Sequence, residues 1–474
     1  MGVIEPGPNH FLRIPPFPRH RAGDLVVARV DPDMPDPDAP DPAALAAALV
    51  EERVGGRFWS PQEDPWTRAA PGDEEAALVH GLRHGGECGP AVAERIMAGA
   101  HCRDPFSGEP MGWIAAVRLL GKWRRLIESN RRFSAIFGIA GWKRETVDAM
   151  LWDGTGPVRY RVCAAGLRGG DVTLSWVARA PAGLGKALEA IGAQQGEIED
   201  GFIRSSGLGA DCVPPFSVIF DELGSYVDPS RESGLERILA GGGIAEEFLE
   251  RAAALRADLV AKGVSKYGAA SGGAVLPPKT RRRVLVTGQV EDDRAVVLGG
   301  AGLDNLALLE RARGLEPGAE IIYKPHPDVE AGHRKGRISD DFILKYADRI
   351  ERGAPISALL GEVDGVHVIS SLAGFEALLR GVEVVTHGVP FYAGWGLTRD
   401  LGAVPERRKR LVSLDEMVAA ALILYPRYLD PVTRLPCPVE VLVERMAAGQ
   451  AGADGALVRL RRMQGVVLRV LGIR

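Results

Sequence analysis

Three short polar runs in the second half of the chain each follow an apolar run. In chain order they are Gln289–Asp293, Lys324–Pro327 and Ser370–Ser371. The apolar runs before them have the length and composition of buried strands. Ligands of open α/β sheets bind at the carboxyl ends of the parallel strands, so we expect these three runs to lie together. A cation, an imidazole and a helix N-terminus at one edge suit a phosphate group. Asp293 beside them is a candidate nucleophile or electrostatic partner.

His326 stands between two prolines, Pro325 and Pro327. Proline fixes its own φ and restricts the residue before it, so the imidazole is held at the end of a strand. A rigid turn with a solvated histidine explains the same residues. Ser371 also has two explanations, an anion site at a helix N-terminus or a plain N-cap. No Glu or Gln stands three residues later to complete a capping box.

A pair of acidic residues, Glu199 and Asp200, precedes Gly201 in the first half, and Arg204 follows. A partly desolvated carboxylate beside a like charge has a raised pKa, which suits a general acid or base. The alternative is a plain turn with Asp200 and Gly201 at its corner.

The elements that would position these residues alternate between strand and helix. Residues 283–286, 320–323, 366–369 and 382–386 are predicted strands, with helices between them that include Asp340–Arg352. This pattern indicates a parallel sheet with helices on both faces. An earlier unit opens at Ala135 as strand, glycine turn and helix. We therefore expect an N-terminal region (1–133), two Rossmann-like domains (134–280 and 281–430) and a helical tail (431–474).

Composition excludes several classes of protein. The chain has 474 residues, 46% hydrophobic and 25% charged, with a net charge of −4, so nothing argues for a nucleic-acid partner. Its five cysteines are scattered, which is unlike a disulfide framework or a zinc site and fits a reducing compartment. No signal peptide or membrane-spanning run is present, so a cytoplasmic protein is expected. No phosphate-binding loop of a nucleotide hydrolase and no dinucleotide fingerprint occurs.

Three other stretches have uncertain roles. Residues 1–75 are rich in Pro and Asp, so we expect them to bury little; their Asp-x-Asp triplets are better explained as linker than as a metal site. The basic run Lys122–Arg125 is predicted to be a solvated helix face, with contact to an acidic lipid head group as the alternative. The tail Gly455–Arg474 carries Arg residues and no acid, and is either a helix on a membrane surface or a helix packed on the body.

Taken together, the motifs resemble the KpsC/KpsS capsule-polysaccharide family of β-Kdo glycosyltransferases. The resemblance covers roughly residues 135–430. The matching runs, in the family's order, are Glu199–Ser205, Pro214–Ser217, Ser265–Tyr267, Gly288–Asp293, Tyr323–Val329, Ala331–Gly336, Ser371–Leu378 and Gly388–Thr398. The longer family members carry two such modules in tandem, whereas this chain has one.

The resemblance implies a GT-B fold, CMP-Kdo as donor and transfer with retention. In the family's Gln-Val-x-x-Asp-x-Ser motif, Gln289 and Asp293 match, with Asp293 as the expected nucleophile, and Ala295 replaces the serine. His326 and Pro327 are similar to the motif that contacts the CMP phosphate in bacterial sialyltransferases, and Ser370 and Ser371 resemble their phosphate-binding serines. Either Glu199 or Asp200 would handle the acceptor proton.

The implied chemistry agrees with these residue types. Loss of CMP gives the anomeric carbon of Kdo oxocarbenium character, which an opposed carboxylate stabilises. Lys324, His326 and the serine pair could neutralise the leaving phosphate without a metal. Candidates for the Kdo carboxylate share a positive charge and are Arg204, Lys266 and Arg334.

The expected role is surface or capsule polysaccharide biosynthesis. The acceptor would be a glycolipid or a Kdo-terminated glycan, and the protein could lie on the inner face of the bacterial inner membrane. The alternatives are a sialyltransferase-like enzyme that uses another CMP-sugar, and a non-catalytic capsule export or assembly protein.

Overall fold

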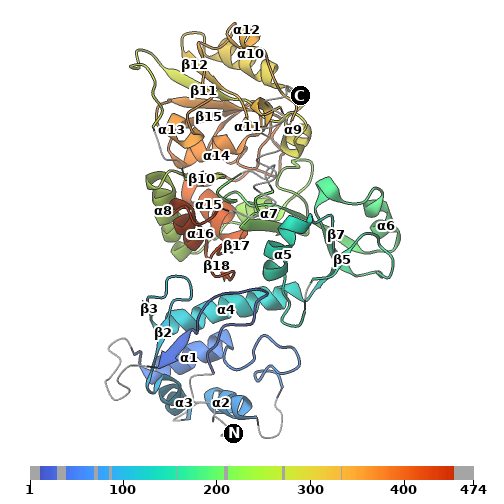
Figure 1. Cartoon of the computed structure of the whole chain (residues 1–474). Coiled ribbons are helices and arrows are strands. Elements are labelled where there is room, and N and C mark those ends of the chain that lie inside the picture. Colours follow the sequence, from blue (N-terminus) through green and yellow to red (C-terminus); the bar gives the residue numbers. More distant parts are fainter. Residues whose placement is uncertain are drawn as a thin grey trace.

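The computed structural model describes residues 11–28, 39–68, 73–84, 88–156, 158–207, 212–269, 273–332 and 334–452 (Figure 1). These residues form a small N-terminal unit and two larger sheets covered by helices. The run Asp31–Asp38 and the tail Gly455–Arg474 lie outside the described residues, so the predictions made for them remain predictions. No helix in the described ranges is long and apolar enough to cross a bilayer.

The N-terminal unit has its own hydrophobic core. Its antiparallel sheet is β1 (Val26–Ala28), β2 (Ala100–Arg103) and β3 (Pro110–Met111), and its helices are α1 (Pro42–Glu52), α2 (Glu74–Arg83), α3 (Cys88–Met97) and α4 (Trp113–Asn130). The expectation that residues 1–75 bury little is wrong for those the structure describes. Phe17, Phe58 and Trp66 are buried in one cluster with Trp113 and Trp123 of α4, because aromatic side chains recur between the prolines.

The first large sheet has the strand order β18-β17-β8-β7-β6-β4-β5. Its strands are β4 (Phe133–Phe137), β5 (Tyr160–Arg161), β6 (Val172–Ser175), β7 (Gln194–Asp200), β8 (Ser217–Asp221), β17 (Arg427–Leu429) and β18 (Pro436–Cys437). The pairs from β5 to β7 are parallel and the pairs from β7 to β18 are antiparallel. The helices of this half are η2 (Gly141–Lys143), α5 (Arg144–Met150), η3 (Val177–Arg179), α6 (Leu184–Ala190), α7 (Gly234–Gly241) and α8 (Glu246–Ala261), followed by the hairpin β9 (Val264–Ser265) and β10 (Gly268–Ala269).

The second large sheet is entirely parallel, in the order β13-β12-β11-β14-β15-β16, which is the classic Rossmann order. Its strands are β11 (Arg283–Thr287), β12 (Glu320–Lys324), β13 (Arg349–Ile350), β14 (Gly365–Val368), β15 (Glu383–Thr386) and β16 (Arg399–Asp400). Its helices are α9 (Arg294–Gly299), α10 (Asn305–Leu315), α11 (Pro327–Glu330), α12 (Asp340–Ile343), α13 (Ile356–Leu360) and α14 (Leu372–Leu379). The predicted α/β class is confirmed.

One predicted helix is wrong over most of its length. The segment Asp340–Arg352 contains only the short helix α12, and its end forms the edge strand β13. Ile322 pairs with Arg349 in a parallel register, and Asp348 Oδ2 accepts a hydrogen bond from Ile321 N at 2.9 Å. Pairing with β12 therefore overrides the helical spacing of these residues.

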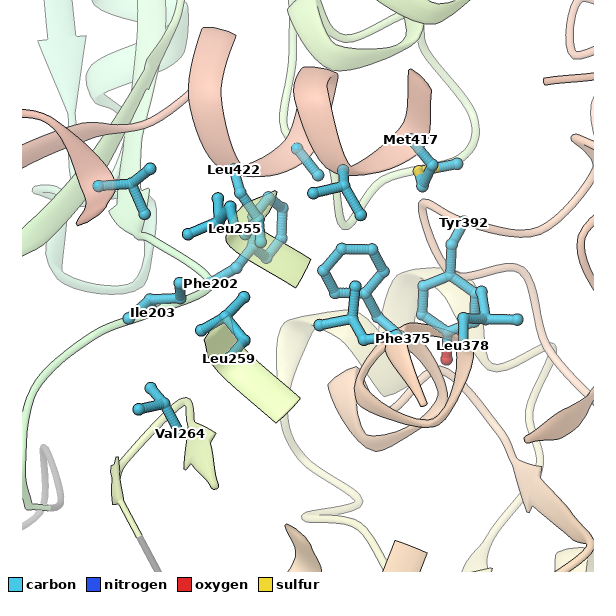
Figure 2. Close-up of a cluster of buried hydrophobic side chains, with 14 of the residues drawn as sticks. Phe202, Ile203, Leu255, Leu259, Val264, Phe375, Leu378, Tyr392, Met417 and Leu422 are labelled. Carbon is cyan, nitrogen blue, oxygen red and sulfur yellow. The ribbon is translucent and has the colours of Figure 1, made fainter. Parts of the chain in front are cut away.

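The chain then returns to the first sheet. Helix α15 (Leu414–Val418) continues into the π-helical turn η5 (Ala419–Leu424), and β17, β18 and α16 (Val439–Ala447) follow. Figure 2 shows Met417 and Leu422 in one buried cluster with Leu255 and Leu259 of α8. Arg427 pairs with Val218 of β8. The expected second domain, 281–430, thus includes a strand that belongs to the first sheet.

Candidate active site

Two of the three polar runs are tied together directly. The Gln289 carboxamide follows β11, and its Oε1 accepts hydrogen bonds from the backbone N of Ile369 and of Ser370, both at 3.0 Å. Its Nε2 donates to Ser370 Oγ at 3.3 Å. Ser370 Oγ in turn donates to Ala295 O at 2.9 Å, which fixes the start of α9 beside the serine pair. The predicted convergence of these strand ends is therefore present, with Gln289 as a clamp between them.

Asp293 is the N-cap of α9. Its Oδ2 accepts a hydrogen bond from Ala295 N at 3.2 Å, and the side chain is otherwise exposed. The Asp293 carboxylate is an electrostatic neighbour of Lys266 and of His326, and it acts on the pKa of both. One exposed carboxylate thus faces a cation from the first half and an imidazole from the second.

His326 is held as the N-cap of α11. Its Nδ1 accepts a hydrogen bond from Asp328 N at 3.1 Å, so the proton of the neutral ring sits on Nε2. Burial lowers the pKa of His326, as do the cations Lys266 and Arg334, and this effect exceeds the opposing one of Asp328 and Asp293. The ring is therefore a neutral Nε2–H donor near neutral pH, which suits a phosphate oxygen.

The acidic pair lies at the end of β7, and its two carboxylates have different environments. Asp200 accepts from Lys143 Nζ at 3.1 Å and from Arg204 Nε at 2.9 Å. Burial alone would raise the pKa of Asp200, but Arg204 and Lys143 together lower it to about 2. Burial and the charge of Asp200 raise the pKa of Glu199. Asp200 is thus a fixed anion, and Glu199 is the group placed to exchange a proton.

Arg294 joins the two halves, and the sequence analysis missed it. Its Nη2 donates to Glu197 Oε2 at 2.8 Å, and its Nη1 lies 3.8 Å from Glu199 Oε2. Nη1 is buried and has no hydrogen-bond partner among the described residues. Since Arg294 follows Asp293 directly, this contact holds the nucleophile candidate against β7. The signal that could have found it is its position inside the Gln-Val-x-x-Asp-x-Ser motif.

Lys266 lies at the centre of these charges. Burial opposes its charge, but Tyr267, Tyr226 and the carboxylates Asp200 and Asp293 raise the pKa of Lys266 above its ordinary value. The Lys266 backbone N donates to Glu376 Oε1 of α14 at 3.0 Å. Lys266 is therefore charged and positioned by contacts from both halves.

Several predicted ligands have protein partners already. The Arg204 guanidinium donates to Asp200, to Ser205 Oγ at 2.7 Å and to Val213 O at 2.8 Å, so it is occupied within the first half. Lys324 Nζ donates to Ala354 O at 2.7 Å, in the loop after β13.

The remaining predicted ligands differ in their exposure. Arg334 Nε pairs with Asp292 Oδ1 at 3.1 Å at the surface. Ser371 Oγ accepts from Ala373 N at 3.2 Å, the N-cap arrangement. Pro327 is the exposed first residue of α11. In the described part of the chain, no group of three or more His, Cys, Asp or Glu could hold a metal ion.

Known proteins match both the sequence and the fold. A family model described as "Capsule polysaccharide biosynthesis protein" matches residues 244–428. The structure of a KpsC β-Kdo 2,4 transferase from Thermosulfurimonas dismutans superposes with a TM-score of 0.58 at 31% identity, over 67% of this chain and 98% of that chain. The chain belongs to the KpsC-type capsule polysaccharide family. The KpsC-type match also confirms the predicted GT-B-like fold.

Other relatives of this KpsC-type chain agree. A KpsC β-Kdo 2,7 transferase structure from the same organism gives a TM-score of 0.54 at 29% identity, over 67% of this chain and 99% of that chain. The capsule polysaccharide modification protein LipA of Neisseria meningitidis serogroup A is 38% identical over 337 residues, which are 70% of this chain and 47% of LipA. The lipopolysaccharide-processing protein LpsZ of Rhizobium meliloti is 46% identical over 236 residues, 49% of this chain and 53% of LpsZ. The KpsC-type chain thus spans about half the length of these curated relatives.

Proposed function

We propose that this chain is a retaining glycosyltransferase that moves Kdo from CMP-Kdo to a glycolipid or Kdo-terminated acceptor in capsule polysaccharide synthesis. The observation that carries the proposal is the contact across the two halves made by Arg294, the residue after Asp293, whose Nη1 lies 3.8 Å from Glu199 Oε2. A retaining transferase needs one carboxylate as nucleophile and a second group for the acceptor proton. The name of the 31% identical T. dismutans structure supports Kdo as the sugar.

In the proposed first step, an Asp293 oxygen attacks the anomeric carbon of Kdo. The bond from that carbon to the CMP oxygen breaks, and CMP leaves as a phosphate monoester. His326 Nε2–H and the Lys266 ammonium stabilise the leaving phosphate, and no metal is required for this charge. Lys324 and Arg204 have no direct part in the proposal, because their donors already bind Ala354 and Asp200.

In the second step, an acceptor hydroxyl oxygen attacks the same carbon and displaces Asp293. The hydroxyl proton passes to Glu199, whose raised pKa makes it a suitable base. Asp200 does not take the proton, because Lys143 and Arg204 hold it as an anion. Two displacements at one carbon give net retention.

The test uses purified protein, CMP-Kdo generated in situ and a Kdo-terminated glycolipid, with products measured by mass spectrometry. Wild type is compared with Asp293→Asn and with Asp292→Asn, a neighbouring exposed carboxylate that pairs with Arg334. The expected result is Kdo addition by wild type and Asp292→Asn and its loss in Asp293→Asn. Transfer from CMP-sialic acid but not CMP-Kdo would assign another donor. No CMP release from either donor by folded protein would reject the enzyme.

A further inference from the structure

A groove of about 590 Å³ lies where the N-terminal unit meets the start of α16. In Figure 1, α16 lies beside β17 and β18 of the first sheet, above α4 of the N-terminal unit. The groove is lined by Pro40, Asp104, Phe106, Met111, Gly112, Trp113, Ile114, Ala115, Arg118, Leu119, Lys122, Pro438 and Val441. None of these residues belongs to the candidate active site.

The groove has two cations on one wall. Arg118 and Lys122 are one turn apart on α4, and both are exposed. None of the hydrogen bonds or ion pairs found within the described ranges involves either side chain. Partial desolvation of the Lys122 side chain and the neighbouring Arg251 lower the pKa of Lys122, against the opposing effect of Glu440 and Glu247. The nearby carboxylate of Glu440 is engaged by Arg251, whose Nη2 donates to Glu440 Oε2 at 2.8 Å. An anion in the groove would therefore meet two cations that form no ion pair with a carboxylate of the described residues.

The one acid in the groove, Asp104, makes no ion pair with these cations among the described residues. The carboxylate of Asp104 is used inside its own turn, where Oδ1 accepts from Phe106 N at 2.7 Å and from Ser107 N at 3.4 Å. The first turn of α4 adds partial positive charge, since its N-cap Gly112 carries no capping side chain. The lining therefore carries two cations against one carboxylate.

The rest of the lining is apolar. Phe106 of the turn before β3, Met111 of β3, Ile114 of α4 and Val441 of α16 line the groove, and each is only partly buried. Such side chains favour hydrocarbon over water. Cations beside an apolar surface fit a molecule that has an acidic head and an alkyl chain. A free anion would use only the cations, and a neutral oil would use only the apolar surface.

We propose that this groove binds the anionic head and the first part of the alkyl chain of an acidic amphiphile. Arg118 and Lys122 take the head, and the apolar residues of β3, α4 and α16 take the chain. The volume is within the range of small-molecule sites. Such a site would hold the protein to an acidic lipid independently of the tail Gly455–Arg474.

The test is calorimetric titration of the full chain with dodecyl phosphate below its micelle concentration, without CMP-Kdo. Two control ligands test the two parts of dodecyl phosphate separately. Inorganic phosphate supplies the head alone, and dodecyl maltoside supplies the chain with a neutral head. Two variants test the two parts of the groove separately. The double variant Arg118→Gln/Lys122→Gln removes the contacts to the head, and Val441→Ser weakens the apolar wall. Arg125→Gln is the matched control, because Arg125 is an exposed cation of α4 that pairs with Glu52 and does not line the groove.

The proposal requires saturable binding of dodecyl phosphate that is at least about tenfold tighter than that of either control ligand. The double Gln variant should weaken it by about tenfold or more, Val441→Ser by a few-fold, and Arg125→Gln by less than twofold. Equal binding of inorganic phosphate, equal binding of dodecyl maltoside, or equal losses in Arg125→Gln and the double variant would each overturn the proposal. Because no turnover is measured, this result and that of the transfer test are separate.

Discussion

Adjacent residues at the end of β7 have opposite roles because their neighbours differ. Asp200 lies between two cations, whereas Glu199 has the charge of Asp200 on one side and the guanidinium of Arg294 only at 3.8 Å on the other. The pKa values of two neighbouring carboxyl groups move apart when cations pair with one and the other is desolvated. Here Asp200 is the paired group and Glu199 the desolvated one. The pair therefore supplies one permanent charge and one group that titrates.

Glu199→Gln is expected to reduce kcat by about 10²–10⁴-fold, the usual contribution of a positioned acid or base. Gln keeps the size of the side chain, so the melting temperature should change little. The pH–rate profile of wild type should rise through the raised pKa of Glu199 as it becomes a base, and this limb should vanish in the variant. The control is Glu197→Gln on the same strand, which also contacts Arg294. Loss of the limb in both variants would assign the proton transfer elsewhere.

Asp200→Asn is expected to lower the free energy of unfolding at pH 7 by at least about 2 kcal/mol. The folded pKa of Asp200, about 2, lies below the ordinary 3.8. Its stabilisation is therefore complete above pH ~4 and is lost as the pH falls through about 2. Denaturant unfolding of both proteins between pH 7 and pH 2.5 should show their difference shrinking with acid. A constant difference would mean that the Asp200 charge is not responsible.

At the scale of elements, His326 can do two things at once: its Nδ1 caps α11, and its Nε2 takes part in none of the hydrogen bonds found among the described residues. His326→Asn keeps an N-cap acceptor and removes the Nε2 donor, whereas His326→Ala removes both. We expect both variants to raise the KM for CMP-Kdo by about 10–100-fold. Only the Ala variant should also lose about 1 kcal/mol of unfolding free energy. Equal KM for Asn and wild type would show that the histidine is only a cap.

The elements of the second sheet could be predicted, because each of its longer strands is a buried apolar run followed by a polar residue. The edge strand β13 could not, since only its pairing with Ile322 and Tyr323 makes it a strand. The N-terminal unit was missed for another reason. Its aromatic residues are spaced by prolines and not by a helical or strand period, so their shared core appears only in three dimensions.

The residues of the candidate site also fall into those that the sequence could predict and those that it could not. Residue types and strand ends were enough to identify Asp293, His326 and the Glu199–Asp200 pair as candidates, because short stretches of sequence carry that information. Short stretches of sequence do not show which side chains already bind another part of the protein and which are free to bind a ligand. Lys324 donates to a carbonyl in the loop after β13, and Arg204 donates to Asp200 before it and to Ser205 and Val213 after it in the chain. Arg294 was missed because its partners lie on β7 of the other half.

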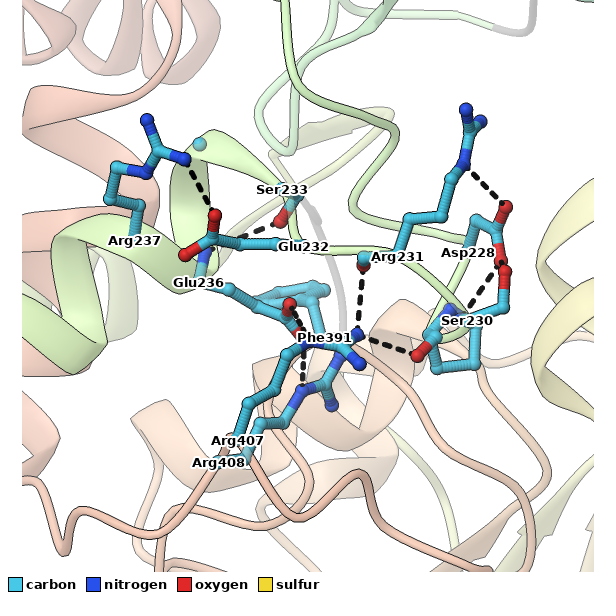
Figure 3. Close-up of polar contacts among 12 residues, drawn as sticks. Asp228, Ser230, Arg231, Glu232, Ser233, Glu236, Arg237, Phe391, Arg407 and Arg408 are labelled. Atoms are coloured by element: carbon cyan, nitrogen blue, oxygen red, sulfur yellow. Dashed lines mark hydrogen bonds and ion pairs between the residues drawn. The ribbon is translucent and has the colours of Figure 1, made fainter.

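At the scale of the whole molecule, a buried ion-pair cluster links the two halves. Figure 3 shows Glu236 of α7 with Arg407 and Arg408 from the segment after β16. Arg407 Nε donates to Glu236 Oε2 at 2.8 Å, and Arg408 Nε donates to Glu236 Oε1. Phe202 and Phe391 stack across the same boundary at 4.5 Å between ring centroids. The two halves are thus held together by both charge and packing.

Glu236→Ala is expected to lower the free energy of unfolding by about 3–5 kcal/mol, because it leaves buried Arg408 without its counter-charge. Glu232→Ala is the control in the same cluster: Glu232 pairs with Arg237 at the surface, and its loss should cost less than about 1 kcal/mol. Calorimetry should show earlier melting of Glu236→Ala, with the two halves no longer unfolding together. Similar losses for both variants would contradict the buried link.

The return of β17 and β18 to the first sheet has a consequence for synthesis. A ribosome releases β4–β8 early, but the strand that covers β8 arrives only after the entire second sheet has been made. Until then β8 is an open edge, ready to pair with another chain. A premature stop between β8 and Arg427 would therefore leave β8 uncovered in the half of the protein that was made first, and we expect it to cause aggregation rather than a stable shortened enzyme.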